Sequence, residues 1–236
     1  MCRVRDFEGF RLRSDVEFDC GMDVNSEIII QSVIIANQRL GNLPFELWRA
    51  VDLKSTGAII GAYLSIAIAE SVGGMVNPIE KGHPDVIPLV NLEAITEEEL
   101  RNYPSGIEVK GTCGNVTQGL RLEKGVPRAA HLTGVTWQAH HREVEKLLST
   151  IWDFSSLYSD TPSPTIQAVF YSEDLVEDDW GAVSGTSGRN TKVSGMLKSG
   201  KEKLGRGTIG ILRNNNLITT YRGRINTIPK EFSYSE

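Results

Sequence analysis

The stretch Ile107-Glu108-Val109-Lys110 gives the clearest indication of fold and function in this chain. A β-strand points alternate side chains to opposite faces, so the two apolar residues are expected in a core and Glu108 and Lys110 share the other face. An acid and a lysine two residues apart, joined by a second acid from a neighbouring strand, can bind a divalent metal beside a positioned water. Asp85, which lies upstream, is the candidate for that second acid. The sequence therefore predicts that these three side chains meet.

The amino-acid composition limits the classes of protein to which this chain can belong. The chain has 236 residues, of which 40% are hydrophobic and 23% charged, as expected of one large globular domain. Its longest apolar run, 59–69, is too short to span a bilayer, and the N-terminus has no apolar signal core, so we expect a cytoplasmic protein without a membrane partner. The three cysteines, Cys2, Cys20 and Cys113, lack metal-ligand spacing, which argues against structural zinc.

Charge is distributed unevenly along the chain. The net charge is −5, but residues 185–236 hold ten basic residues against three acids, whereas the remainder holds 15 against 27. A basic segment on an acidic body can bind phosphate locally, and Arg189, Lys192 and Lys198 are candidates for DNA contacts. The alternative is a solvated, salt-bridged surface segment, and charge alone does not separate the two.

Periodicity and turn residues predict a mixture of helices and strands. Helices are expected over 26–40, 44–51, 55–71, 96–100 and 142–152, and strands over 85–89, 107–110, 133–141 and 165–171. Residues 208–212 and 217–221 resemble a hairpin around Arg213 and three asparagines. Strands alternating with helices favour an α/β or α+β domain with a mixed sheet.

Glu70 is the third candidate acid. It follows Ile59, Tyr63 and Ile66 at helical spacings, which places it on the inward-facing stripe of the 55–71 helix. A carboxylate there needs a cation, a metal or hydrogen-bond donors. The alternative is a frayed helix end, from which the side chain reaches water.

The order of these elements resembles the PD-(D/E)XK nuclease superfamily, whose best-known members are restriction endonucleases. The matching residues are Pro84-Asp85 and Glu108-Val109-Lys110, with 22 residues between the two acids, preceded by the helix that carries Glu70. The resemblance covers about residues 55–172. It implies a restriction endonuclease-like core, with a central mixed sheet flanked by helices and a basic C-terminal lobe or hairpin.

The resemblance also implies a site and a reaction. Asp85 and Glu108 would be Mg²⁺ ligands, with the carbonyl of Val109 as a third. Lys110 would position or activate the attacking water, and Glu70 would be an accessory acid. The reaction would be Mg²⁺-dependent, sequence-specific cleavage of double-stranded DNA to 5′-phosphate and 3′-hydroxyl ends, as in type II restriction enzymes, by a homodimer that cuts both strands.

The expected organisation is a single nuclease domain, with an N-terminal scaffold at 1–54, the catalytic core at 55–172 and a basic DNA-contacting segment at 184–236. Gln138 and His140 alternate with the core-facing Trp137 and could face the site or the DNA. Two other functions remain open from the residues: a repair or junction nuclease, and a non-enzymatic α/β nucleic-acid-binding or assembly protein.

Overall fold

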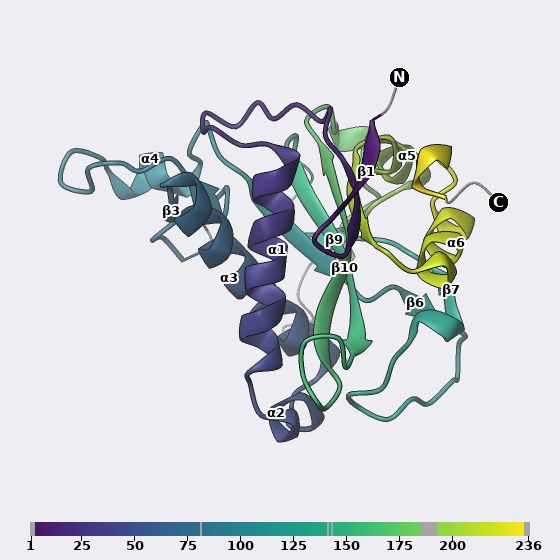
Figure 1. Cartoon of the computed structure of the whole chain (residues 1–236). Helices are drawn as coiled ribbons and strands as arrows, with labels where there is room; N and C mark the ends of the chain where they lie inside the picture. The colour runs from purple at the N-terminus through teal and green to yellow at the C-terminus, as the bar shows by residue number, and fades with distance from the viewer. Residues whose placement is uncertain (1–2, 81, 141, 143, 185–192, 234–236) are drawn as a thin grey trace.

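The structure is a computed structural model that describes residues 3–80, 82–140, 142, 144–184 and 193–233 (Figure 1). Its centre is a six-stranded sheet in the order β1-β2-β12-β10-β9-β5. Neighbouring strands are antiparallel except for β5 and β9, which run parallel, so the sheet is mixed. The strands are β1 (Val4–Phe7), β2 (Phe10–Arg13), β5 (Glu108–Thr112), β9 (Leu147–Ser155), β10 (Ser163–Ser172) and β12 (Thr208–Leu212).

Helices cover both faces of this sheet (Figure 1). One face packs on α1 (Ser26–Gly41) and α3 (Leu53–Val72), and the other on α5 (Lys198–Arg206) and α6 (Asn215–Arg224). Two shorter helices are α2 (Phe45–Ala50) and α4 (Glu97–Arg101). The expectation of a central mixed sheet flanked by helices is confirmed at this level.

Short elements complete the chain. They are β3 (Met75–Val76), β4 (Val86–Ile87), β6 (Asn115–Val116), β7 (Leu132–Gly134), β8 (Gln138–Ala139) and β11 (Ser194–Gly195), with 3₁₀ turns at Ala129–His131, Glu177–Asp179 and Lys230–Phe232. They pair as β3 with β4, β6 with β7, and β8 with β11.

Local sequence explains the helices that were predicted well. The Asn25 side chain caps α1 by accepting from the Ile28 amide, and Asp52 caps α3 through Ser55. Gly73 ends α3 in the left-handed conformation, with a φ of 63°. Thr96 and Glu99 form the capping box of α4.

With 20 residues and a mean hydropathy of 1.4, α3 is long and apolar enough to cross a membrane. Among the described residues it is the one helix of this kind. A core helix meets the same criteria, and α3 packs against α1 and β5. The helix has 20 residues and is therefore longer than the apolar run 59–69.

Three predicted elements are wrong. The predicted helix at 142–152 is instead largely strand β9, whose residues are all buried except Ser155. A strand buried on both faces need not alternate apolar and polar residues, so its apolar positions can also match a helical period. The predicted strand at 217–221 is part of α6, because Asn214 caps a helix by accepting from the amides of Asn216 and Leu217. The predicted strand 133–141 is reduced to β7 and β8.

The basic C-terminal hairpin is therefore wrong as well. β12 lies inside the sheet between β2 and β10, while α5 and α6 cover one of its faces. The sheet takes β1 and β2 from the expected scaffold segment and β12 from the expected DNA-contacting segment. The three expected segments thus share one sheet.

Candidate active site

Strand β5 positions the central pair of the site. Glu108 is 4% exposed, and its side chain and that of Lys110 share one face of the strand. Val109 points the other way and joins the apolar core beneath α1 and α3. β5 is the edge strand of the sheet, with β9 on one side only. The open edge leaves room for a further segment to approach Glu108 and Lys110.

That segment is the chain around Asp85. Val86 and Ile107 exchange two backbone hydrogen bonds, of 3.1 and 2.8 Å, and β4 pairs in turn with β3. These bonds fix Asp85 beside β5, where its Oδ2 accepts a 2.8 Å hydrogen bond from the Val109 amide. Asp85 itself precedes β4, which is only two residues long.

The three predicted side chains do meet. The Lys110 Nζ lies 2.5 Å from Glu108 Oε1 and 3.7 Å from Asp85 Oδ2. Both carboxylates therefore lie within ion-pair distance of the same ammonium. All three side chains are at least two-thirds buried, with exposed fractions of 33% for Asp85, 5% for Glu108 and 20% for Lys110.

His83 is a fourth member that sequence reasoning missed. Its Nδ1 lies 3.1 Å from both carboxylate oxygens of Glu108. The backbone of His83 is held from both directions, since its amide donates to the Arg101 carbonyl and its carbonyl accepts from the Tyr103 amide. In the sequence, His83 lies two residues before Asp85, the same spacing as between Glu108 and Lys110. Side chains two residues apart in an extended segment share a face, and this was the signal for His83.

Burial and the neighbouring groups shift the pKa values of all four side chains. Burial would raise the pKa of Glu108, but the hydrogen bond from His83 and the charge of Lys110 outweigh it and lower that pKa to about 2. Burial raises the pKa of Asp85 more than the Lys110 charge lowers it. Burial would lower the pKa of Lys110, but both carboxylates overcome this and raise it. The hydrogen bond to Glu108 raises the pKa of His83. Glu108 is thus the ionised centre of the cluster.

The donor set fits Mg²⁺, which binds through one or two carboxylates and keeps several waters. Asp85 and Glu108 supply the carboxylates. The amide and carbonyl of one strand residue point to the same side, and the Val109 amide points to Asp85, so its carbonyl faces that side too. Among the described residues, no group of three or more His, Cys, Asp and Glu side chains has the geometry of a metal site, so a protein-only cage is not present there.

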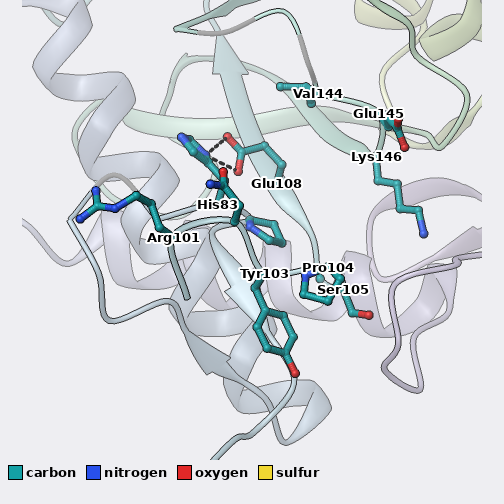
Figure 2. A pocket seen from close by; sticks show the side chains of 12 residues that line it. His83, Arg101, Tyr103, Pro104, Ser105, Glu108, Val144, Glu145 and Lys146 are labelled. Atoms are coloured by element: carbon teal, nitrogen blue, oxygen red, sulfur yellow. Dashed lines mark hydrogen bonds and ion pairs between the residues drawn. The ribbon is translucent and has the colours of Figure 1, made fainter. Parts of the chain in front are cut away.

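A cavity of about 470 Å³ opens beside Glu108 and His83 (Figure 2). Its walls include Arg101, the last residue of α4, Tyr103, which lies between α4 and β5, and Lys146, which precedes β9. The candidate site is therefore continuous with a space large enough for part of a substrate.

Glu70 does not join the cluster. Its side chain is 54% exposed, and its Oε2 lies 2.6 Å from the guanidinium of Arg39 on α1. The expectation of an inward-facing acid that serves Lys110 is wrong. α3 packs on the face of β5 that carries Val109, whereas Lys110 lies on the opposite face.

The DNA-binding candidates are scattered. Gln138 and His140 are exposed while Trp137 and Ala139 are buried, as their alternation predicts, but neither polar residue lines the cavity beside Glu108. Lys198 is 83% exposed at the start of α5 and faces Glu202 at 3.7 Å. Arg189 and Lys192 lie outside the described residues.

Several basic residues of the C-terminal part have structural partners. Lys203 pairs with Asp179 at 2.8 Å, Arg213 with Asp6 at 3.3 Å, and Arg224 donates to the Leu132 carbonyl at 2.5 Å. For Lys203 and Arg213 the salt-bridged alternative describes the observed contacts.

Comparison of the chain with protein-family models, with curated proteins and with solved structures found no match. The function of the site must therefore be argued from its own geometry.

Proposed function

We propose that this protein is a Mg²⁺-dependent, sequence-specific endonuclease for double-stranded DNA, similar to type II restriction enzymes. It hydrolyses phosphodiester bonds to leave 5′-phosphate and 3′-hydroxyl ends. The observation that carries the proposal is the convergence of Asp85 and Glu108 on the Lys110 ammonium, at 3.7 and 2.5 Å, at the open edge of the sheet.

The chemistry requires oxygen ligands, an oriented water and a nearby cation. Asp85, Glu108 and the Val109 carbonyl would hold Mg²⁺, which supplies charge neutralisation at the scissile phosphate and lowers the pKa of a bound water when present. Lys110 orients the attacking water by hydrogen bonding and offsets the negative charge that develops on the phosphate. His83 donates to Glu108 and fixes the direction of its carboxylate. Glu70 has no part in this proposal, since it pairs with Arg39.

Cleavage of both strands of a symmetric DNA site needs two such centres, so we include a two-fold homodimer in the proposal. Gln138, His140 and Lys198 stay candidates for DNA contacts because all three are exposed. Base recognition by polar side chains is expected in the major groove, where each base pair shows a distinct pattern.

The test is incubation of the purified protein with unmethylated DNA of several sources, in Mg²⁺, in Mn²⁺ and in EDTA, followed by gel electrophoresis. We expect discrete fragments that need the metal, and loss of cleavage in Asp85→Asn with DNA binding retained. A metal-dependent smear would keep the nuclease chemistry but indicate a non-specific or structure-specific enzyme. Intact DNA under all conditions, with specific binding retained, would contradict the proposal in favour of a non-enzymatic DNA-binding protein.

A further inference from the structure

The cavity beside the candidate active site has walls of two kinds. Its volume of about 470 Å³ lies within the range of small-molecule sites. Pro84, Tyr103, Pro104 and Val144 supply its apolar lining, and the aromatic ring of Tyr103 is a surface on which a nucleobase can stack. Glu108 lines the same cavity, so a group bound there lies next to the proposed metal ligands.

Two cations stand on opposite sides of the His83–Glu108 pair, Arg101 on one side and Lys146 on the other (Figure 2). Each has a partner that is more exposed than itself. Arg101 pairs with Glu97, with side-chain exposures of 41% and 67%, and Lys146 lies 2.7 Å from Asp19, with exposures of 29% and 79%. Exposed ion pairs contribute little free energy, so a phosphate can replace either acid at small cost.

The remaining charges limit what the cavity can bind. Glu108 and Glu145 line it as well, so a small anion placed in its middle would be repelled. A ligand that fits must put an uncharged, flat group against the apolar wall and keep its negative charge near Arg101 or Lys146. A nucleotide has this distribution of charge, with a neutral base and sugar and a phosphate at each end of its unit in a DNA strand.

We infer that this cavity is a subsite for one deoxynucleotide of the DNA, adjoining the scissile phosphate, with the base on the Tyr103 wall and the flanking phosphates at Arg101 and Lys146. The position next to the scissile phosphate rests on the proposed function. The binding of a nucleotide in the cavity does not, because it requires only the cavity and its two cations.

The test is a titration of the ¹⁵N-labelled full chain with deoxyadenosine 5′-monophosphate in EDTA, followed by amide NMR. Saturable shifts are expected at the cavity residues Tyr103, Ser105, Gly106 and Lys146. Tyr103→Ala should weaken binding at least about fivefold through lost stacking, and Lys146→Gln by about two- to fivefold through a lost exposed contact. Lys54→Gln is the matched control, since Lys54 is an exposed lysine on α3 that lies outside the cavity, and it should leave the affinity unchanged.

Parallel titrations use deoxyadenosine and inorganic phosphate alone, each of which should bind more weakly than the nucleotide. Three outcomes would overturn the inference. They are equal affinity for phosphate alone, shifts only outside the cavity, and shifts at the cavity that are unchanged in Tyr103→Ala. The outcome is separate from the proposed cleavage. If DNA is cut but the nucleotide does not bind, the subsite falls and the nuclease stands. If the nucleotide binds but DNA is never cut, the cavity keeps its ligand and the nuclease proposal falls.

Discussion

Lys110 is the residue on which both buried acids depend. Without its ammonium, Glu108 would retain its contact with His83, and Asp85 would retain the hydrogen bond from the Val109 amide. Removing one member of a buried charged group leaves the others poorly compensated. The same side chain is thus expected to matter for both stability and catalysis.

Lys110→Ala should lower kcat for DNA cleavage by about 10²–10⁴-fold, because the water loses its orienting cation. The free energy of unfolding should fall by about 3 kcal/mol, the cost of breaking a buried ion pair. Both are measured on purified variants, by cleavage rates in Mg²⁺ and by urea unfolding. Lys54→Ala, at an exposed lysine on α3, should change neither quantity. Full cleavage by the Lys110 variant would exclude it from the mechanism.

Glu70→Gln should leave the cleavage rate unchanged, because Glu70 contacts Arg39 rather than Lys110. The free energy of unfolding should fall by less than about 1 kcal/mol, as expected of a pair with exposures of 36% and 54%. Cleavage assays and thermal unfolding measure the two effects. A large drop in kcat with normal stability would restore Glu70 to the site.

At the scale of elements, the turn before β5 keeps Asp85 in place. Gly106 has a φ of 139°, and a Cβ there would lie 2.2 Å from the Val86 carbonyl oxygen and 2.5 Å from Pro84 Cγ. No side chain fits without displacing the segment that carries Asp85. The glycine therefore allows the 84–86 segment to approach β5 closely enough for the acids to meet.

Gly106→Ala should destabilise the protein by at least about 1–3 kcal/mol from backbone strain, and should reduce cleavage by moving Asp85. Gly223→Ala is a matched control in α6, because its Cβ would meet no atom within 4 Å. The control should be neutral or stabilise by about 0.5–1 kcal/mol, as alanine does in a helix. Thermal unfolding and cleavage rates test both, and equal behaviour of the two variants would contradict the explanation.

Asp179 ties the Glu177–Asp179 turn to α5. Its Oδ2 accepts from Lys203 Nζ at 2.8 Å and from the Val176 amide at 2.9 Å. Burial would raise the pKa of Asp179, but the hydrogen bonds from Lys203, Ser199 and Val176 outweigh it and lower that pKa below 3.8. The stabilisation by ionised Asp179 is therefore complete at pH values above the ordinary aspartate pKa. It is lost as the pH falls through the lowered pKa of Asp179 in the folded protein.

Asp179→Asn should accordingly cost about 1.5–3 kcal/mol of unfolding free energy at pH 7, the value of hydrogen bonds to a charged group. The difference from the wild type should shrink as the pH falls below 3.8, where the wild-type carboxylate becomes protonated. Urea unfolding between pH 2.5 and 7 measures this. A difference that stays constant over that range would show that the charge of Asp179 is not responsible.

At the scale of the whole molecule, the candidate site lies outside the packed core. The sheet is packed on both faces, and the cluster of acids lies at its edge. A metal bound only by the folded protein stabilises it in proportion to the logarithm of its concentration. The proposed Mg²⁺ site should thus be detectable in unfolding experiments as well as in cleavage.

Mg²⁺ at about ten times its Kd should raise the unfolding free energy by about 1.4 kcal/mol, which is roughly 3–6 °C in Tm for a chain of this size. Asp85→Asn should lose this shift, and EDTA should leave the protein folded but unable to cleave. Calorimetric scans with and without Mg²⁺ decide the point. An identical shift in the variant would place the Mg²⁺ elsewhere.

The sequence alone determined the local features. Apolar periodicity predicts α1 and α3, the glycine stop predicts the end of α3, and the capping box predicts α4, because these signals act within a few residues. The alternation of Ile107 to Lys110 predicts which side chains share a face, because a strand has a strict period of two. This pattern and the resemblance predict the three site residues, and the structure brings them together.

Only the tertiary structure decided the rest. β9 is a strand because it is buried between β5 and β10, although its apolar spacing also suits a helix. Glu70 faces Arg39 because α3 packs on the far side of β5, and His83 meets Glu108 because the 83–86 segment pairs with Asn102 and Ile107. These outcomes depend on contacts between residues far apart in the chain, and a local pattern carries no information about which distant partner a side chain meets.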